Sequence, residues 1–68
     1  MPSPKGGHMP VVQINWFKGR SRDTKQKVAE LIEKTMIDVA GCKPGDTHVM
    51  FNEYDRENWA INGNLRDK

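Results

Sequence analysis

Two strand-like segments on either side of one long helical segment limit most strongly how this chain can fold. Residues 10–17 (PVVQINWF) and residues 47–53 (THVMFNE) place their side chains alternately on two faces, as strands do. Residues 21–39, which lie between them, carry apolar side chains at the 3.6-residue spacing of a helix. A helix that connects two strands of one sheet makes those strands parallel. The sequence therefore predicts an α/β fold (α+β in some schemes) with a β-α-β core.

The helical segment has a clear beginning and end. Ser21 is a good N-cap, and Asp23 suits the positive end of the helix dipole. Gly41 follows the segment closely, as is common after a helix. The spacing predicts one apolar stripe along the helix, which consists of Val28, Leu31, Ile32, Thr35 and Val39. Ala29, Met36 and Ile37 widen this stripe or lie beside it.

The end of the chain predicts a small hairpin. Residues 54–58 form a polar connection, and residues 59–61 (WAI) form a short apolar segment. Asn62-Gly63 is a strong signal for a hairpin turn, because both residues tolerate positive φ angles. A charged tail, residues 65–68, follows. We therefore expect a short C-terminal hairpin beside the β-α-β unit.

The small size of the chain predicts association between subunits. Residues 1–9 (MPSPKGGHM) fit no periodic pattern, and we interpret them as a flexible leader or a tag remnant. The single domain is then residues 10–68, and chains below about 70–80 residues usually need a disulfide, a metal or a partner. Cys42 is the one cysteine, and with His8 and His48 it gives no zinc-like spacing. Oligomerisation remains, with no metal and no cofactor expected.

The hydrophobic pattern supports the same expectation. One helix covers one face of a two-stranded sheet, and nothing else in the chain is left to cover the other face. That face carries Val11 or Val12, then Trp16 or Phe17, and from the second strand Met50 or Phe51. A second subunit is the natural cover for such a face.

Charge and hydropathy exclude other classes of protein. A net charge of +2, from 11 basic and 9 acidic residues, makes a weak electrostatic footprint for nucleic acid. No apolar run approaches the roughly 20 residues of a membrane span, and no signal peptide is evident. We expect a soluble, cytoplasmic protein with neither a nucleic acid nor a membrane as partner.

Three segments resemble the 4-oxalocrotonate tautomerase family, part of the tautomerase superfamily with an amino-terminal proline. They are PVVQI (10–14), KGRS (18–21) and WAING (59–63), and the resemblance covers residues 10 to about 65. It implies a protomer that pairs its sheet with a neighbour's, most often in a homohexamer built as a trimer of dimers. It also implies an isomerase that moves a proton between carbon and oxygen of small enols, such as 2-hydroxydienoates, in aromatic hydrocarbon catabolism.

The resemblance makes Pro10 the catalytic residue. An ordinary α-amino group has a pKa of about 7.7–8.0, and burial near a cation lowers its affinity for a proton. Such a nitrogen can act as a general base, and its conjugate acid can return the proton. With residues 1–9 attached, however, the nitrogen of Pro10 is an amide and has no amine basicity. Activity by this route is therefore expected only when Pro10 is the free N-terminus.

The resemblance also implies the substrate-binding residues. Arg20, from a neighbouring subunit, matches the arginine that holds the substrate carboxylate through its planar fork. Trp59 matches the aromatic wall of the pocket, and Val11 and Phe17 are expected to line it.

The chain departs from the family at one position. His48 stands where the family has a second arginine, and a histidine gives weaker electrostatic help. Arg56 is an alternative source of the missing charge, and Glu53 is the only carboxylate on the strand that could activate water. The alternatives are therefore a promiscuous or non-catalytic oligomer with this fold, or a dehalogenase, hydratase or decarboxylase of the family.

Overall fold

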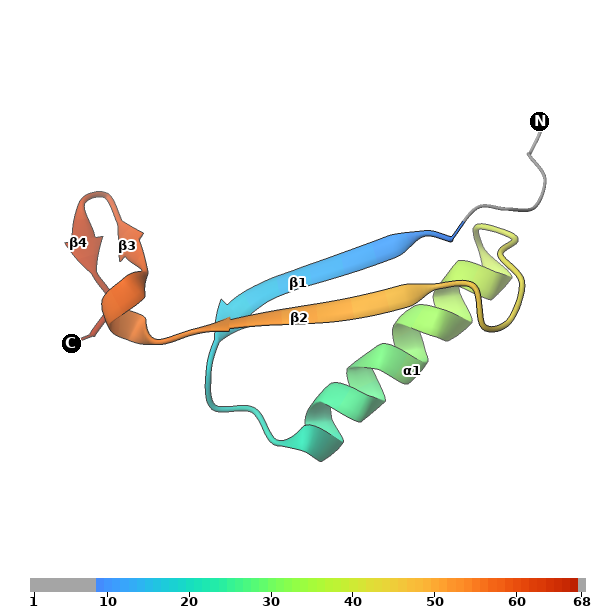
Figure 1. The fold of residues 1–68 in the computed structure, drawn as a ribbon, viewed down its shortest axis with the longest axis horizontal. Helices are drawn as coiled ribbons and strands as arrows, with labels where there is room; N and C mark the ends of the chain where they lie inside the picture. The colour runs from blue at the N-terminus through green and yellow to red at the C-terminus, as the bar shows by residue number, and fades with distance from the viewer. Residues whose placement is uncertain (1–8, 68) are drawn as a thin grey trace.

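The computed structural model describes residues 9–67 and confirms the β-α-β core (Figure 1). The expected leader falls almost entirely outside the described residues, since only Met9 of it is included. The elements, in chain order, are β1 (Val11–Phe17), α1 (Arg22–Asp38), β2 (His48–Tyr54), a short 3-10 helix η1 (Arg56–Asn58), β3 (Ala60–Ile61) and β4 (Asn64–Leu65).

The two long strands form a parallel ribbon. Val11 lies opposite His48, and the register continues to Phe17 opposite Tyr54. The hydrogen bonding extends past the strand ends, because the His48 amide donates to the Pro10 carbonyl at 2.8 Å. At the other end, the Lys18 amide donates to the Tyr54 carbonyl at 2.9 Å. Strand β2 thus includes Tyr54, which the sequence pattern assigned to the following connection.

Helix α1 has the predicted start. The Oγ atom of Ser21 accepts a hydrogen bond from the Thr24 amide at 3.1 Å, which satisfies one of the unpaired amides of the first turn. After the helix, the Cys42 amide donates to the Met36 carbonyl at 3.1 Å, and Gly41 takes a φ of 76°. This positive φ explains the glycine at the helix end.

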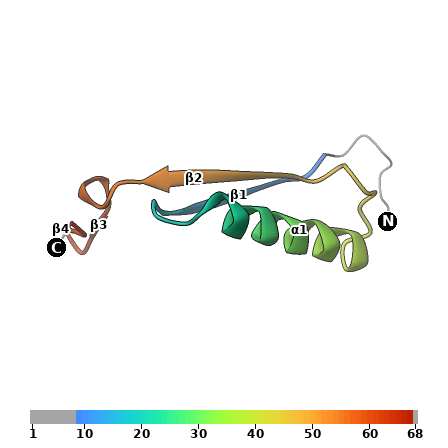
Figure 2. The same cartoon turned by 90° about the horizontal axis from the view of Figure 1, so that it is seen from below.

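Helix α1 covers only one face of the ribbon (Figure 2). The apolar stripe expected from the spacing is partly wrong: Leu31 is 55% exposed, Val39 is 81% exposed, and Thr35 is exposed as well. Periodicity shows that a helix has an apolar side, but the contacts with the sheet set its rotation about its axis. The half-buried side chains of the helix are Lys25, Val28, Ala29, Ile32, Glu33, Met36 and Ile37.

The C-terminal hairpin is confirmed. Strands β3 and β4 are antiparallel, and the two turn residues have positive φ angles, 55° at Asn62 and 79° at Gly63. Two positive φ angles in a two-residue loop are typical of a type I′ turn, which favours this residue pair. The hairpin projects past the end of β2 and away from α1 (Figure 1). The Arg66 amide, just after β4, donates to the Trp59 carbonyl at 2.9 Å.

A single protomer is open and elongated. Its radius of gyration is 15.7 Å, whereas a compact domain of this length has about 10–11 Å. No side chain among residues 9–67 is fully buried, and Val11 and Met50 are about half exposed on the face away from α1. We call this face, which carries Val11, Gln13, Asn15 and Phe17 of β1 and His48, Met50, Asn52 and Tyr54 of β2, the outer face. No helix in the described part of the chain is long and apolar enough to cross a membrane.

Candidate active site

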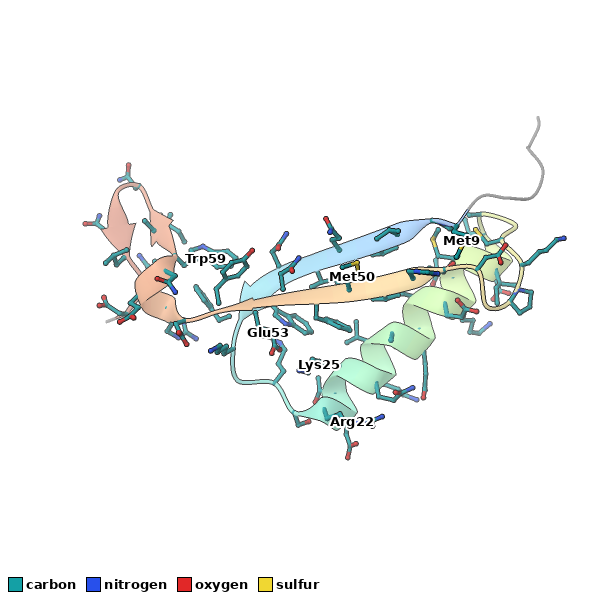
Figure 3. The ribbon with its side chains drawn as sticks, in the orientation of Figure 1. Met9, Arg22, Lys25, Met50, Glu53 and Trp59 are labelled. Atoms are coloured by element: carbon teal, nitrogen blue, oxygen red, sulfur yellow. The ribbon has the colours of Figure 1, made fainter. Side chains whose placement is uncertain are left out.

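The expected site residues lie at opposite ends of the ribbon. Pro10, Val11 and His48 are at one end, while Phe17, Arg20 and Trp59 are at the other. Phe17 lies seven positions after Pro10 along an extended strand, a distance of about 23 Å at 3.3 Å per residue. Figure 3 shows the same separation, with Met9 at one end and Trp59 at the other. The expected site residues of one protomer therefore fall into two groups that do not touch, the half-sites that we call the proline end and the arginine end.

The proline end is held in place by the sheet. Pro10 is half-buried, and its carbonyl accepts the hydrogen bond from the His48 amide that starts the parallel pairing. Val11 and His48 are directly opposite each other in the register and both are exposed. The proline end thus combines a proline, an apolar side chain and an imidazole.

The arginine end begins just after β1. Nη1 of Arg20 donates to the Phe17 carbonyl at 3.3 Å. The guanidinium carbon of Arg20 lies 4.2 Å from the centroid of the Trp16 ring, within the range of a cation–π interaction. Arg20 is exposed, and within the part of the chain that the structure describes only its Nη1 group donates, which leaves other N–H donors for a carboxylate.

An aromatic cluster, which we call the aromatic wall, lies at the same end of the ribbon and includes Phe17 and Tyr54 of the outer face, whereas Arg20 contacts Trp16 on the other face of β1. The ring centroids of Phe17 and Trp59 are 4.6 Å apart, and those of Tyr54 and Trp59 are 5.6 Å apart in an edge-to-face arrangement. The guanidinium carbon of Arg56 lies 4.1 Å from the Phe17 centroid. Sequence reasoning missed Tyr54, whose alternation with Asn52 along the strand was the available signal. An open hollow of about 390 Å³ beside this wall is lined by Asn15, Tyr54, Asn58, Trp59 and Ala60.

Glu53 lies on the helix side of the sheet and not on the outer face. Its Oε2 accepts a hydrogen bond from Nε1 of Trp16 at 3.2 Å, and its Oε1 accepts one from Nζ of Lys25 at 3.2 Å. The side chains of Lys25 and Glu53 are only 29% and 23% exposed, and Figure 3 shows them pointing toward each other. Both carboxylate oxygens are therefore engaged away from both half-sites, and the geometry gives no support to Glu53 as a base that activates water.

The open β-α-β protomer, with a proline at the head of β1 and an arginine just past its end, is the arrangement that the tautomerase resemblance predicts. The family model for tautomerase enzymes matches residues 10–68. The chain therefore belongs to the tautomerase family, and its activity is that of a tautomerase, an isomerase.

Individual relatives agree with this family. The chain is 35% identical over 57 residues to a probable tautomerase from Ralstonia nicotianae, which covers 84% of this chain and 88% of the relative. It is 31% identical over 55 residues to 2-hydroxymuconate tautomerase from Comamonas testosteroni, covering 81% and 87%. The fold matches a heterohexameric 4-oxalocrotonate tautomerase from Chloroflexus aurantiacus with a TM-score of 0.81 and 17% identity, over 88% of this chain and 97% of that one.

Proposed function

We propose that this tautomerase interconverts the keto and enol forms of small enol carboxylates, with Pro10 as the proton carrier once it is the free N-terminus. The observation that carries the proposal is the division of the expected residues into two half-sites at opposite ends of one ribbon. The proline end of one protomer forms a complete site only against the arginine end of another. The protein is then an oligomer whose sites lie between subunits.

The proposed reaction is a proton transfer without a cofactor. The neutral nitrogen of Pro10 takes the proton from the enol hydroxyl, and the electron pair of that O–H bond forms the carbonyl as the carbon–carbon double bond shifts. The protonated nitrogen then gives the proton to the carbon at the end of the shifted system. The proton is returned in full and no electrons are gained or lost, so one group serves as base and acid in turn.

The arginine end supplies binding and electrostatic help. Arg20 offers a planar fork for the substrate carboxylate, and its positive charge favours negative charge that develops on the substrate. Phe17 and Trp59, whose rings contact each other, supply apolar surface at the same end of the ribbon that would keep water from a bound substrate. Val11 lines the proline end of the same site.

Arg56 is the better candidate than His48 for a second positive charge. Its guanidinium lies over Phe17, beside the aromatic wall of the arginine end. His48 lies at the proline end, where its amide bonds to the Pro10 carbonyl. We propose that Arg56 binds a second polar group of the substrate and that His48 offers a hydrogen bond near the proline.

A hexamer of identical chains, arranged as a trimer of dimers, is the proposed assembly. It is supported by the uncovered outer face and by the Chloroflexus aurantiacus relative, which is a heterohexamer. Substrates of the 2-hydroxydienoate type are supported by the relative named 2-hydroxymuconate tautomerase. A role in aromatic hydrocarbon catabolism, which rests on the resemblance alone, and a cytoplasmic location, which rests on the sequence pattern, complete the proposal.

The test compares a chain that begins at Pro10 with the chain that carries residues 1–9. All helices and strands of the described part lie within residues 11–65, so both chains keep them. Ketonisation of phenylenolpyruvate is measured, and intact mass establishes the first residue of each sample. General acid–base catalysis contributes about 100-fold or more, so a loss of at least that size is expected with the leader attached.

Pro10→Ala in the shorter chain is the matched variant, because it keeps a free amine but changes its basicity and geometry. Equal activity with and without the leader would eliminate Pro10 as the proton carrier. Absence of activity in every sample, with assembly intact, would instead favour the non-catalytic oligomer.

A further inference from the structure

We propose that Trp16 is a positioning residue that holds the guanidinium of Arg20 in the orientation that binds the substrate carboxylate. This inference rests on the proposed function, since it concerns the binding role of Arg20. Trp16 itself does not touch the substrate in this proposal, because its side chain lies on the helix side of β1.

The contact between the two side chains is the first part of the argument. The Arg20 guanidinium carbon lies 4.2 Å from the centre of the Trp16 ring, so the planar group sits over the face of the indole. Within residues 9–67, the one other contact found for Arg20 is its hydrogen bond to the Phe17 carbonyl at 3.3 Å. Gly19, with a φ of 132°, precedes Arg20 and gives the backbone there unusual freedom. The indole face is therefore the main restraint on this arginine.

The indole is itself held from two other elements. Its Nε1–H donates to Glu53 on β2 at 3.2 Å, and Lys25 of α1 pairs with the same carboxylate at 3.2 Å. The Phe51 ring stacks on Trp16 with centroids 5.3 Å apart and an angle of 19° between the planes. A carboxylate acceptor also pushes electron density toward the indole ring, which strengthens its attraction for a cation. Trp16 thus connects β1, β2 and α1 to one substrate-binding group.

The positioning role of Trp16 affects binding of substrates that carry a carboxylate. Orientation of Arg20 lowers the entropy that the side chain loses when it binds a carboxylate. A substrate without a carboxylate does not engage the planar fork of Arg20, so the orientation of that fork does not help it to bind. Loss of the indole is therefore expected to weaken binding of the acid and to leave binding of an uncharged analogue unchanged.

The test uses the chain that begins at Pro10, with phenylenolpyruvate and its methyl ester as substrates. Trp16→Leu is expected to raise KM for the acid about two- to fivefold, the effect of an exposed cation–π contact. The KM for the ester, which has no carboxylate for Arg20 to hold, is expected to stay unchanged. Trp16→Phe keeps a ring face and is expected to retain most of the binding. Ile14→Val, on the same face of β1, is the control for general loss of packing and is expected to match the wild type.

Two outcomes would overturn the proposal. Equal increases in KM for acid and ester in Trp16→Leu would show that Trp16 does not act by positioning Arg20 for the carboxylate. Additive effects of Trp16→Leu and Arg20→Gln on KM would show that the two residues act independently. If Trp16→Leu does not fold, KM for the acid and for the ester is compared instead in Trp16→Phe and Glu53→Gln, which change the packing less.

A readout that does not depend on catalysis separates this proposal from the proposed function. Proton NMR of the full chain is expected to show the Arg20 side-chain signals shifted upfield by the indole ring, and Trp16→Phe is expected to reduce the shift. Titration with benzoate is expected to move these signals, with a Kd about two- to fivefold weaker in Trp16→Leu. If the shorter chain has no activity but these shifts are seen, the proposed function fails and the positioning role stands. Unshifted Arg20 signals in the wild type would refute the positioning role directly.

Discussion

Two inactive variants are expected to restore each other's activity when their subunits mix. Pro10→Ala removes the proton carrier and Arg20→Gln removes the carboxylate fork, and each variant alone is expected to lose most activity in phenylenolpyruvate ketonisation. The two residues are separated by a strand of about 23 Å within one protomer, which is far beyond the reach of an arginine side chain. If Pro10 and Arg20 act on the same substrate, as proposed, each complete site therefore takes its proline end and its arginine end from different chains.

The size of the recovery follows from this geometry. In an assembly formed at random from equal amounts of the two variants, half of the proline ends and half of the arginine ends are intact. Because the two ends come from different protomers, about one quarter of the sites contain both intact ends. If both ends came from the same protomer, no intact site would form at all.

The assay uses chains that begin at Pro10, mixed in denaturant and refolded together. Native mass spectrometry establishes that mixed assemblies are present. A second mixture, wild type with the Pro10→Ala/Arg20→Gln double variant, is the matched control. Its activity is expected to fall from about half to about one quarter of the wild-type value when subunits exchange. Mixed assemblies with no recovered activity, together with a control that stays at half, would refute a site shared between subunits.

Two further predictions concern the outer face and the substrate. Met50→Lys places a charge on the outer face, where Met50 is 47% exposed in the protomer, and is expected to cost at least about 1 kcal/mol of association per protomer. Light scattering after size exclusion is expected to show smaller assemblies, and an unchanged mass at all concentrations would contradict an interface there. Arg56→Gln is expected to raise KM about tenfold for a dicarboxylate such as 2-hydroxymuconate, the effect of losing a charged hydrogen bond. It is expected to have little effect on phenylenolpyruvate, and equal increases for both substrates would remove Arg56 from the binding of a second carboxylate.

The sequence predicted the order of elements well because local signals mark it strongly. Ser21 caps α1, and Asn62-Gly63 forms the hairpin turn, as their residue types indicate. The rotation of α1 was less predictable, because apolar residues lie around more than half of the helix. Leu31 and Val39 fit the periodicity as well as Ile32 does, yet both are exposed in the protomer. Only the contacts with the strands decide between such neighbouring rows.

The candidate site was predictable residue by residue but not in its arrangement. The resemblance identifies Pro10 and Arg20, while the parallel pairing of the ribbon puts them at opposite ends. The link from Glu53 through Trp16 to Arg20 joins residues up to 37 positions apart. No local sequence pattern predicts such a link, because each of the three residues is also common in an ordinary strand or loop.

The lack of any fully buried side chain among residues 9–67 has a consequence for how this protein responds to dilution. In the proposed assembly, the contacts that keep the chain folded are also the contacts between copies. Unfolding and dissociation then become one equilibrium, governed by mass action, and the melting temperature rises with protein concentration. At concentrations too low for assembly, the chain loses its catalytic sites and its fold together. The protein concentration then determines the fraction of chains that are folded and active.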